Sequence, residues 1–499
     1  MISDMAERVV VINSAASEKR VAILEDNSLI ELYIDRDEKE RLVGNIYKGK
    51  VINVVHGLKA AFVNIGQERN GFLPLSEIPY QQLVEDAEIE VESTRELAVK
   101  ENQDIIIQVT KESYSGKGPR LTSYVSLPGR YVVLLVNSRH IGVSRKIRDR
   151  NKRQKLREIA RKHRPPRMGL ILRTAASLAS DEMISEEIKS LYEDWQGIKE
   201  KAKHDGPVIL YKEPDLVIRM MRDLHPKDVK TIFVDDEASL NRIERYLKRR
   251  GGELLSRLRL YQGESPIFDQ FGIEDEIRKA LERKIWLKSG GYITIDETEA
   301  LVAIDVNTGR SAQEKNPEAL AYQTNIEAIK EIARQLRLRD IGGLVIIDLI
   351  DMAKRGNYMR VISNLKKLLK KDRAHYKIGK LTNFGVLELT RERTRLSLSE
   401  TIKETCPHCL GVGRVLSRRS LYSYIERRLM MEQERISGGT IEIRVSPRVA
   451  DFLITTAFGG IKELGAKIGV NIVITPDKAV GENEFKVFRI HPYQELTSG

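Results

Sequence analysis

Two apolar segments in the second half of the chain each carry acidic residues. Asp305 and Asn307 lie two residues apart in LVAIDVN (301–307), and Asp348 lies in LVIIDLID (344–351). Side chains alternate along a strand, so Asp305 and Asn307 are expected on one face. Carboxylate and amide oxygens suit Mg²⁺ or Mn²⁺, which also bind phosphate oxygens. These residue types predict metal-assisted phosphodiester hydrolysis, in which the ion would activate a water and stabilise charge on the phosphate.

The elements around these residues are predicted to bring the two aspartates together. The pattern indicates a hairpin of strands 292–295 and 301–307, a helix that begins at 316–318 and stops at 342–343, and a strand at 344–351. This order makes two parallel strands whose carboxyl ends lie side by side. We expect Asp305 and Asp348 close together in mostly apolar surroundings, where a divalent cation offsets their repulsion. The alternative is a structural role, with both aspartates bound to loop backbone or paired with Arg310.

The only two cysteines, Cys406 and Cys409, form a Cys-x-x-Cys sequence followed by two glycines. This arrangement is typical of half of a tetrahedral zinc site. The other two ligands must be histidines, with His408 as a local candidate, or must come from a second copy of the chain. A redox pair and two unliganded cysteines are the alternatives; a redox pair usually opens a helix, whereas glycines follow here.

Composition indicates a protein of several packed domains that binds a polyanion. The 499 residues correspond to roughly three domains. Lys and Arg number 84 against 72 Asp and Glu, and the resulting net charge of +12 favours nucleic acid. The amino terminus carries acidic residues where a signal peptide would be basic. No apolar run reaches the roughly 18 residues that a membrane span needs. We therefore expect a cytoplasmic protein, consistent with its sparse cysteines.

Short strands in the first quarter of the chain predict a small β-barrel. After hairpins in residues 8–36, strands are predicted at 46–51, 60–66, 71–75 and 104–109. This spacing is typical of an OB-type barrel, whose exposed aromatic and basic residues bind single strands. The candidates are Tyr47, Phe62, Phe72, Lys48, Lys50 and Lys117. Alternatively, Phe62 and Phe72 fill the barrel interior.

A second basic region follows the barrel. Residues 145–167 hold 12 Lys or Arg and two acidic residues, which fits either a solvated helix face or a nucleic-acid contact. The next predicted strand, 168–172, ends in Arg173 and Thr174, where a guanidinium and a hydroxyl could hold a phosphate. After residue 417, segments 441–445, 449–464 and 471–475 predict a strand, helix and strand.

With these residues identified, the chain resembles the ribonuclease E/ribonuclease G family of bacterial endoribonucleases. The matching segments occur in the family's order and cover nearly the whole chain: VGNIYKGK (43–50), AAFV (60–63), GFL (71–73), IDVNTG (304–309), IDLIDM (347–352) and CPHCLGVG (406–413). The long disordered tail of many ribonuclease E proteins is missing, so we expect the ribonuclease G type.

The resemblance implies a Mg²⁺-dependent endonuclease of single-stranded, often A/U-rich RNA, acting in rRNA and tRNA processing and mRNA decay. It makes Asp305 and Asp348 ligands of one catalytic ion per chain, and makes Asn307 the residue that orients the scissile phosphate or a water. It makes Phe62, Phe72 and Lys117 RNA-contacting residues. It places Gly129, Val133, Arg173 and Thr174 in a pocket that senses a 5′-monophosphate. His375 stands where ribonuclease E has an arginine in the sensing pocket, which implies weaker or pH-dependent sensing.

The resemblance also implies a multidomain α/β and β architecture. Its parts are an RNase H-like subdomain (1–40 and 220–280) interrupted by an OB-type barrel (41–123) and a sensor region (124–219), then a DNase I-like catalytic domain (281–402), a zinc link (403–417) and a small α/β C-terminal domain (418–499). Cys406 and Cys409 of two chains would share one Zn²⁺ in a homodimer, and the C-terminal domain would join dimers into a tetramer. A non-catalytic RNA-binding scaffold is the alternative function, although a scaffold has no need of Asp305, Asn307 and Asp348.

Overall fold

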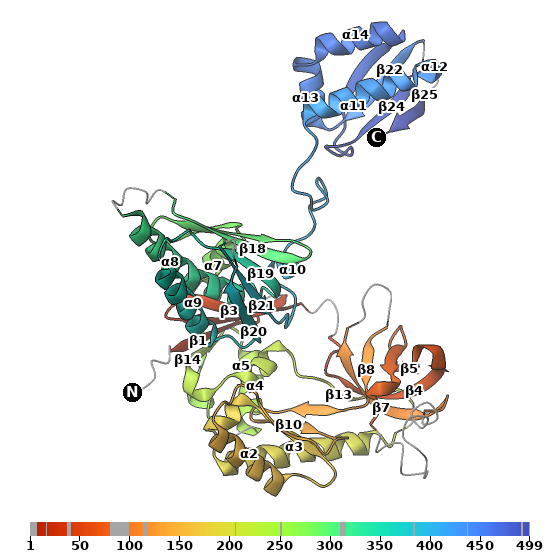
Figure 1. Cartoon of the computed structure of the whole chain (residues 1–499). Coiled ribbons are helices and arrows are strands. Elements are labelled where there is room, and N and C mark those ends of the chain that lie inside the picture. The colour runs from red at the N-terminus through yellow and green to blue at the C-terminus, as the bar shows by residue number, and fades with distance from the viewer. Residues whose placement is uncertain are drawn as a thin grey trace. The chain divides into compact units, whose positions relative to one another are not determined.

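A computed structural model describes residues 7–15, 17–36, 41–79, 99–112, 118–204, 206–249, 252–309, 316–382, 385–436, 438–490 and 493–498. The chain forms two compact units, residues 1–401 and 402–499 (Figure 1). Within the described ranges, no helix is both long enough and apolar enough to cross a membrane. Among the described residues the first unit has four β-sheets and the second has one, each with helices or turns around it, so the mixed α/β and β class is confirmed.

The first sheet joins the amino terminus to a much later part of the chain. Its strand order is β15-β14-β1-β2-β3, and β1 pairs in parallel with β14. Its apolar side chains pack on helices α4 and α5. The strands are β1 (Arg8–Asn13), β2 (Glu18–Glu25), β3 (Ser28–Arg36), β14 (Val229–Val234) and β15 (Leu258–Leu260), and the helices are α4 (Leu216–Asp223), α5 (Glu237–Arg249), α6 (Ile267–Gln270) and α7 (Ile273–Ala280).

The second sheet is the predicted barrel. Its order is β13-β4-β5-β6-β8-β7, and β4 also pairs with β7, which closes the sheet on itself. Buried residues such as Val51, Val63 and Leu121 fill the interior. The strands are β4 (Ile46–Val55), β5 (Ala60–Asn64), β6 (Gly71–Pro74), β7 (Asp104–Lys111), β8 (Arg120–Thr122) and β13 (Val208–Tyr211).

The third sheet lies next in the chain and carries the basic region. Its order is β11-β12-β10-β9, and helices α2 and α3 pack on it. Helix α2 begins at Asp149, whose carboxylate accepts the N–H groups of Asn151 and Lys152, and it buries Leu156 and Ile159. The basic run therefore forms an amphipathic helix with a cationic outer face. The elements are β9 (Ser126–Pro128), β10 (Val132–Leu135), β11 (Ile141–Val143), β12 (Gly169–Leu172), α2 (Arg150–His163) and α3 (Asp181–Lys201).

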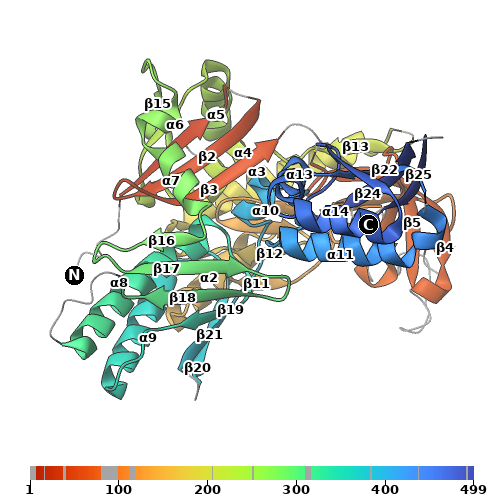
Figure 2. The same ribbon diagram turned by 90° about the horizontal axis from the view of Figure 1, so that it is seen from above.

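The fourth sheet holds the two aspartates and has helices on one face (Figure 2). Its order is β16-β17-β18-β19-β21-β20, and β18 and β19 are parallel, as predicted. Asn316 caps α8, and its side chain accepts the N–H of Ala319. The elements are β16 (Lys284–Trp286), β17 (Tyr292–Glu297), β18 (Leu301–Asn307), β19 (Gly343–Asp348), β20 (Tyr376–Leu381), β21 (Val386–Arg391), α8 (Pro317–Leu338), α9 (Arg355–Leu369) and α10 (Leu398–Ile402).

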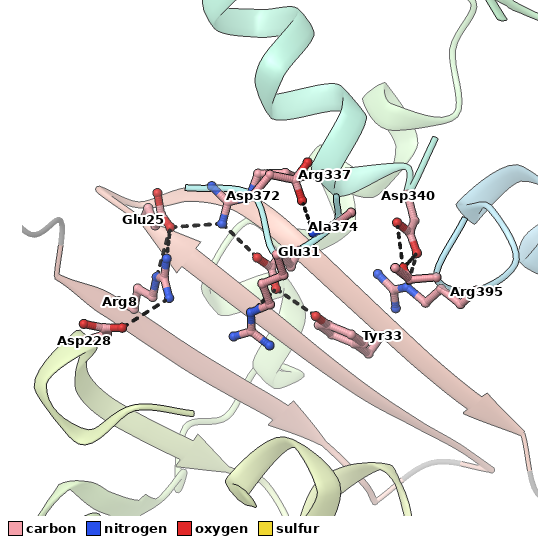
Figure 3. A network of polar contacts seen from close by, with 12 residues as sticks. Arg8, Glu25, Glu31, Tyr33, Asp228, Arg337, Asp340, Asp372, Ala374 and Arg395 are labelled. Atoms are coloured by element: carbon pink, nitrogen blue, oxygen red, sulfur yellow. Dashed lines mark hydrogen bonds and ion pairs between the residues drawn. The ribbon is translucent and has the colours of Figure 1, made fainter. Parts of the chain in front are cut away.

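A buried ionic network joins α8 to the first sheet (Figure 3). Arg337 donates to Glu25 at 3.1 Å and to Glu31 at 2.8 Å, and all three side chains are buried or nearly so. Burial acts to raise the pKa of both carboxyls, but the neighbouring guanidinium groups outweigh it and hold both pKa values below their usual range. The network fixes the aspartate-bearing domain to the amino-terminal sheet.

The second unit is a small α/β domain. Its sheet order is β23-β22-β24-β25, and β22 and β23 are parallel. The single helix predicted over 449–464 is instead two helices, because the chain leaves the helical path around Thr456 and Ala457. The elements are α11 (Arg418–Met431), α12 (Gln433–Ile436), β22 (Thr440–Val445), α13 (Pro447–Thr455), α14 (Phe458–Ile468), β23 (Asn471–Pro476), β24 (Phe485–Ile490) and β25 (Tyr493–Ser498).

Candidate active site

Asp305 and Asp348 lie directly opposite each other on adjacent strands. They form the last register pair of the parallel β18–β19 ladder. Asn307 lies on the same face, and its Nδ2 donates to Asp305 Oδ2 at 2.7 Å. The strand–helix–strand pattern therefore brings together the two acids and the amide that the sequence singles out.

The expectation of mostly apolar surroundings is wrong. Asp305 and Asp348 are both exposed, whereas the adjacent Ile304 and Ile347 are buried against the helices. The reason is the period of two along a strand, which sends the apolar neighbours to the opposite face. The carboxylates therefore lie on the open face of the sheet, accessible to a large substrate.

A third carboxylate adds to the negative charge at this edge. Partial burial raises the pKa of Asp348, and repulsion from Asp305 and then Asp351 raises it further. Tyr358 donates its hydroxyl to Asp351 at 3.3 Å and accepts the N–H of Met352 at 3.0 Å, which fixes the Asp351 loop. Asp351 is not among the site residues that the sequence predicts, although its spacing of three residues from Asp348 is a usable signal.

These donors fit a hard divalent ion that keeps part of its water shell. In the described part of the chain no group of three or more His, Cys, Asp or Glu side chains is arranged to hold a metal, so the protein does not build a closed cage here. Two opposed carboxylates beside an amide match Mg²⁺, which typically combines one or two carboxylates with water and phosphate oxygens. Arg310, the alternative partner, lies outside the described residues.

The two barrel phenylalanines lie outside the barrel core. Phe62 and Phe72 are register partners on β5 and β6, and their rings meet edge to face at 5.9 Å. Both are partly exposed, while the flanking Ala61 and Leu73 are fully buried, so the interior alternative is wrong.

The basic and tyrosine candidates of the barrel have different surroundings. Tyr47 was expected to be exposed but is only 3% exposed, because its strand position points into the barrel. Lys48 pairs with Asp104 at 2.9 Å and donates to the carbonyl of His204 at 2.9 Å. Lys50 is exposed, and Lys117 lies outside the described residues.

The predicted phosphate grips lie at one end of the third sheet, with their polar atoms already engaged. Arg173 Nη1 donates to the carbonyl of Gly129 at 2.6 Å and pairs with Asp223 at 2.8 Å. The hydroxyls of Thr174 and Ser144 are 2.9 Å apart. Val133 lies in β10 and pairs with Ile171 of β12. Arg173 therefore already has an internal anionic partner.

Gly129 lies directly against the carboxylate of Glu187. A Cβ there would be 2.5 Å from the carboxyl carbon of Glu187, whose oxygens accept the backbone N–H groups of residues 130–132.

The segment before His375 contacts Lys146, which follows β11 of the third sheet. Lys146 Nζ donates to the carbonyls of Asp372 and Arg373, and burial lowers its pKa. The side chain of His375 is exposed, and its carbonyl accepts the N–H of Glu392 at 2.8 Å.

The cysteines form a tight turn that presents both sulfurs. The backbone N–H groups of Cys409 and His408 hydrogen-bond to the sulfur of Cys406 and lower the pKa of its thiol. Leu410, Gly411 and Gly413 all have positive φ angles, of 49°, 88° and 78°, which closes the turn. Neither cysteine is in a disulfide. The turn fits half of a zinc site, and the described residues supply no third ligand beside it.

Comparison with known proteins adds an independent finding. Residues 126–394 match the ribonuclease E/G family, residues 42–122 the S1 RNA binding domain, and residues 405–490 the RNase E/G thioredoxin-like domain. The S1 match agrees with the OB-type barrel of the second sheet.

Three relatives cover almost the whole chain. It is 36% identical over 495 residues to ribonuclease E of Haemophilus influenzae, covering 98% of this chain and 53% of that protein. It is 35% identical to ribonuclease G of the same organism and 34% identical to ribonuclease G of Escherichia coli K12, in each case over 96% of this chain and 98% of the relative. The chain thus spans about half of the ribonuclease E relative and nearly all of both ribonuclease G relatives.

Proposed function

The chain belongs to the ribonuclease E/G family, and on that premise we propose that it is a metal-dependent endoribonuclease that hydrolyses single-stranded RNA. One observation carries the proposal: Asp305 faces Asp348 across parallel strands, on an exposed face, with Asn307 donating to Asp305. The S1 match and the partly exposed Phe62 and Phe72 support RNA as the substrate.

The residues divide the work at the sheet edge. Asp305 and Asp348 would hold Mg²⁺, which when bound lowers the pKa of water and offsets phosphate charge. Asn307 donates to Oδ2 of Asp305, which orients that carboxylate and leaves its second oxygen free of this bond. Asp351 adds negative charge that favours retention of a cation beside Asp348. The open face lets an unpaired strand reach this edge, whereas a deep pocket would not.

The test of this function separates cleavage from binding. Asp305→Asn and Asp348→Asn should each lower kcat for a single-stranded RNA oligomer at least ~100-fold, because electrostatic stabilisation of the phosphate is worth several kcal/mol. RNA affinity, measured by fluorescence anisotropy, should change little. The matched control is Glu388→Gln. Glu388 is an exposed carboxylate on the adjacent strand β21, where it lies opposite Ile346 of β19. Parental cleavage by both asparagine variants would contradict the proposal, and binding without cleavage by the parent chain would favour a scaffold.

A preference for 5′-monophosphorylated RNA is a finer part of the proposal. Gly129, Val133, Arg173 and Thr174 lie together, and a phosphate would compete with Asp223 for Arg173. Because Asp223 competes for Arg173 and a histidine stands at position 375, we expect only a modest preference for the 5′-monophosphate. A 5′-monophosphate substrate should be cut faster than its 5′-hydroxyl counterpart, and Asp223→Asn should widen the difference. Equal rates for both substrates in both proteins would remove sensing from the account.

A shared zinc link is proposed from the cysteine turn. Cys406 and Cys409 of two chains would complete one tetrahedral S₄ site, because each chain presents two sulfurs and the described residues offer no third ligand nearby. About half an equivalent of zinc per chain is expected, and Cys406→Ser with Cys409→Ser should reduce both zinc content and the dimer seen in sedimentation. One full equivalent in a monomer would point instead to a local site that includes His408.

Several finer features stay predictions from the family. They are the assembly of dimers into a tetramer, action on rRNA, tRNA and mRNA, and the RNase H-like and DNase I-like subdomains.

A further inference from the structure

The open face of the aspartate-bearing sheet continues past the carboxylates onto two further strands. Trp286 of β16 lies opposite Tyr292 of β17, which lies opposite Asn307 of β18. The neighbouring row holds Lys284, Thr294 and Asp305 in the same strand order. Directly opposed residues share a face, so both rows lie on the face that carries the candidate metal ligands.

Trp286, Tyr292 and Lys284 form a compact aromatic and cationic cluster. The Trp286 and Tyr292 rings meet edge to face with centroids 5.4 Å apart. Lys284 Nζ is 4.0 Å from the centroid of Trp286 and 3.6 Å from that of Tyr292. Trp286 is nevertheless 59% exposed, so a large ring remains in contact with solvent at this position. Exposed aromatic rings with a nearby cation are the chemistry that stacks nucleobases and attracts their phosphates.

The position of the cluster indicates that it binds part of the same RNA strand that reaches Asp305. Neighbouring strands are ~5 Å apart, so the cluster on β16 is ~10 Å from Asp305 and Asn307 on β18, a span that one or two nucleotides cover. Arg283, the residue before this strand, already pairs with Asp296 at 2.7 Å, so Lys284 is the cation of the cluster that faces the rings. A second protein copy is a poorer fit, because a stable interface needs about 1,000 Å² of contact and one exposed ring supplies little of it.

We propose that Trp286, Tyr292 and Lys284 form a stacking platform for an unpaired base of the RNA, one or two nucleotides from the phosphate at Asp305 and Asp348. The inference rests on the proposed function for the identity of the bound strand. The platform accepts any base and modestly favours a purine next to the cut, since a purine offers more stacking area than a pyrimidine.

The chain offers a direct spectroscopic test, because it has only two tryptophans. Trp195 is 6% exposed in the core of the third sheet, so in a Trp195→Phe variant Trp286 is the only indole. Single-stranded RNA added without a divalent ion should lower the Trp286 emission by more than half, with saturation at the concentration at which anisotropy of the labelled RNA saturates. Unchanged emission while anisotropy reports binding would overturn the platform. If Trp195→Phe does not fold, the same signal is the difference between the parent chain and Trp286→Phe.

Kinetics supply the second test. Trp286→Ala should raise KM about tenfold with little change in kcat, because stacking on one base contributes equally to ground-state and transition-state binding. Trp286→Phe should restore most of the affinity. Met359→Ala is the matched control, since Met359 is 63% exposed on α9, on the covered side of the sheet. An unchanged KM for Trp286→Ala, or an altered oligomeric state with no response to RNA, would contradict the proposal.

The two proposals fail in different ways. RNA that quenches Trp286 but is never cut leaves the platform in place and removes the nuclease. RNA that is cut without quenching removes the platform alone.

Discussion

Two carboxylate clusters on different sheets of the first unit show different uses of the same chemistry. Glu25 and Glu31 are buried against Arg337, and their pKa values are lowered. Asp305 and Asp348 are exposed and face each other, and the pKa of Asp348 is raised by partial burial and by its acidic neighbours. In the first cluster the chain supplies the cation, and the cluster joins two sheets. In the second the negative charge is left in excess, and there we propose that a cation from solution binds.

The largest expected effect on stability comes from removing the internal cation. Arg337→Met removes the guanidinium that bridges the buried Glu25 and Glu31 and leaves them with Arg8 and Arg373. Because two buried charges lose one of their partners, we expect the free energy of unfolding of the first unit to fall by about 3 kcal/mol. Urea denaturation followed by circular dichroism measures the change. Arg283→Met is the matched control, because its ion pair with Asp296 is exposed and should contribute little. Equal losses in the two variants would mean that burial does not distinguish the clusters.

The same network gives a pH dependence whose direction follows from the lowered pKa values. Glu25 and Glu31 have folded-state pKa values below the ordinary 4.5, so the stability they contribute is fully present above about pH 4.5 and is lost as the pH falls toward those values. Urea midpoints measured from pH 7 to pH 3 should fall in the acidic range. Glu31→Gln with Glu25→Gln should flatten that part of the curve, and an unchanged slope would show that other carboxylates dominate.

The smallest effect is expected at the exposed pair when no metal is present. Asp348→Asn removes a like-charge repulsion, so the variant should be as stable as the parent chain or slightly more stable. Adding Mg²⁺ should raise the melting temperature of the parent chain but not that of the variant, because a bound ligand stabilises only a protein that binds it. Thermal scans with and without Mg²⁺ provide the measurement. A variant that is much less stable than the parent would give Asp348 a structural role.

The contrast also explains which features the sequence could predict. The parallel pair around Asp305 and Asp348 was accessible because Asn316 and Pro317 mark the helix start and the flanking strands are strongly apolar. The exposure of the two aspartates follows from the period of two along a strand. Their apolar neighbours in the sequence suggest buried surroundings, but those neighbours point to the opposite face.

Other features lay beyond local pattern. The pairing of β1 with β14 and the contact of Arg337 with Glu31 each join residues far apart in the chain, and no local periodicity encodes such contacts. The platform at Lys284 and Trp286 depends instead on a nearby element. Strand β16 has only three residues, too few for a strand pattern to be recognised before the hairpin that begins at Tyr292. The edge-to-face contact of Phe62 with Phe72 likewise required the strand register.

Binding of a divalent ion to the Asp305–Asp348 pair tests the central claim most directly. Mn²⁺ can be titrated calorimetrically into a Cys406→Ser, Cys409→Ser background, so that the cysteine turn does not contribute. We expect about one ion per chain in this background, and loss of that binding when either Asp305→Asn or Asp348→Asn is added. Equal binding in the presence and absence of these substitutions would contradict the assignment of the exposed carboxylates as the metal site.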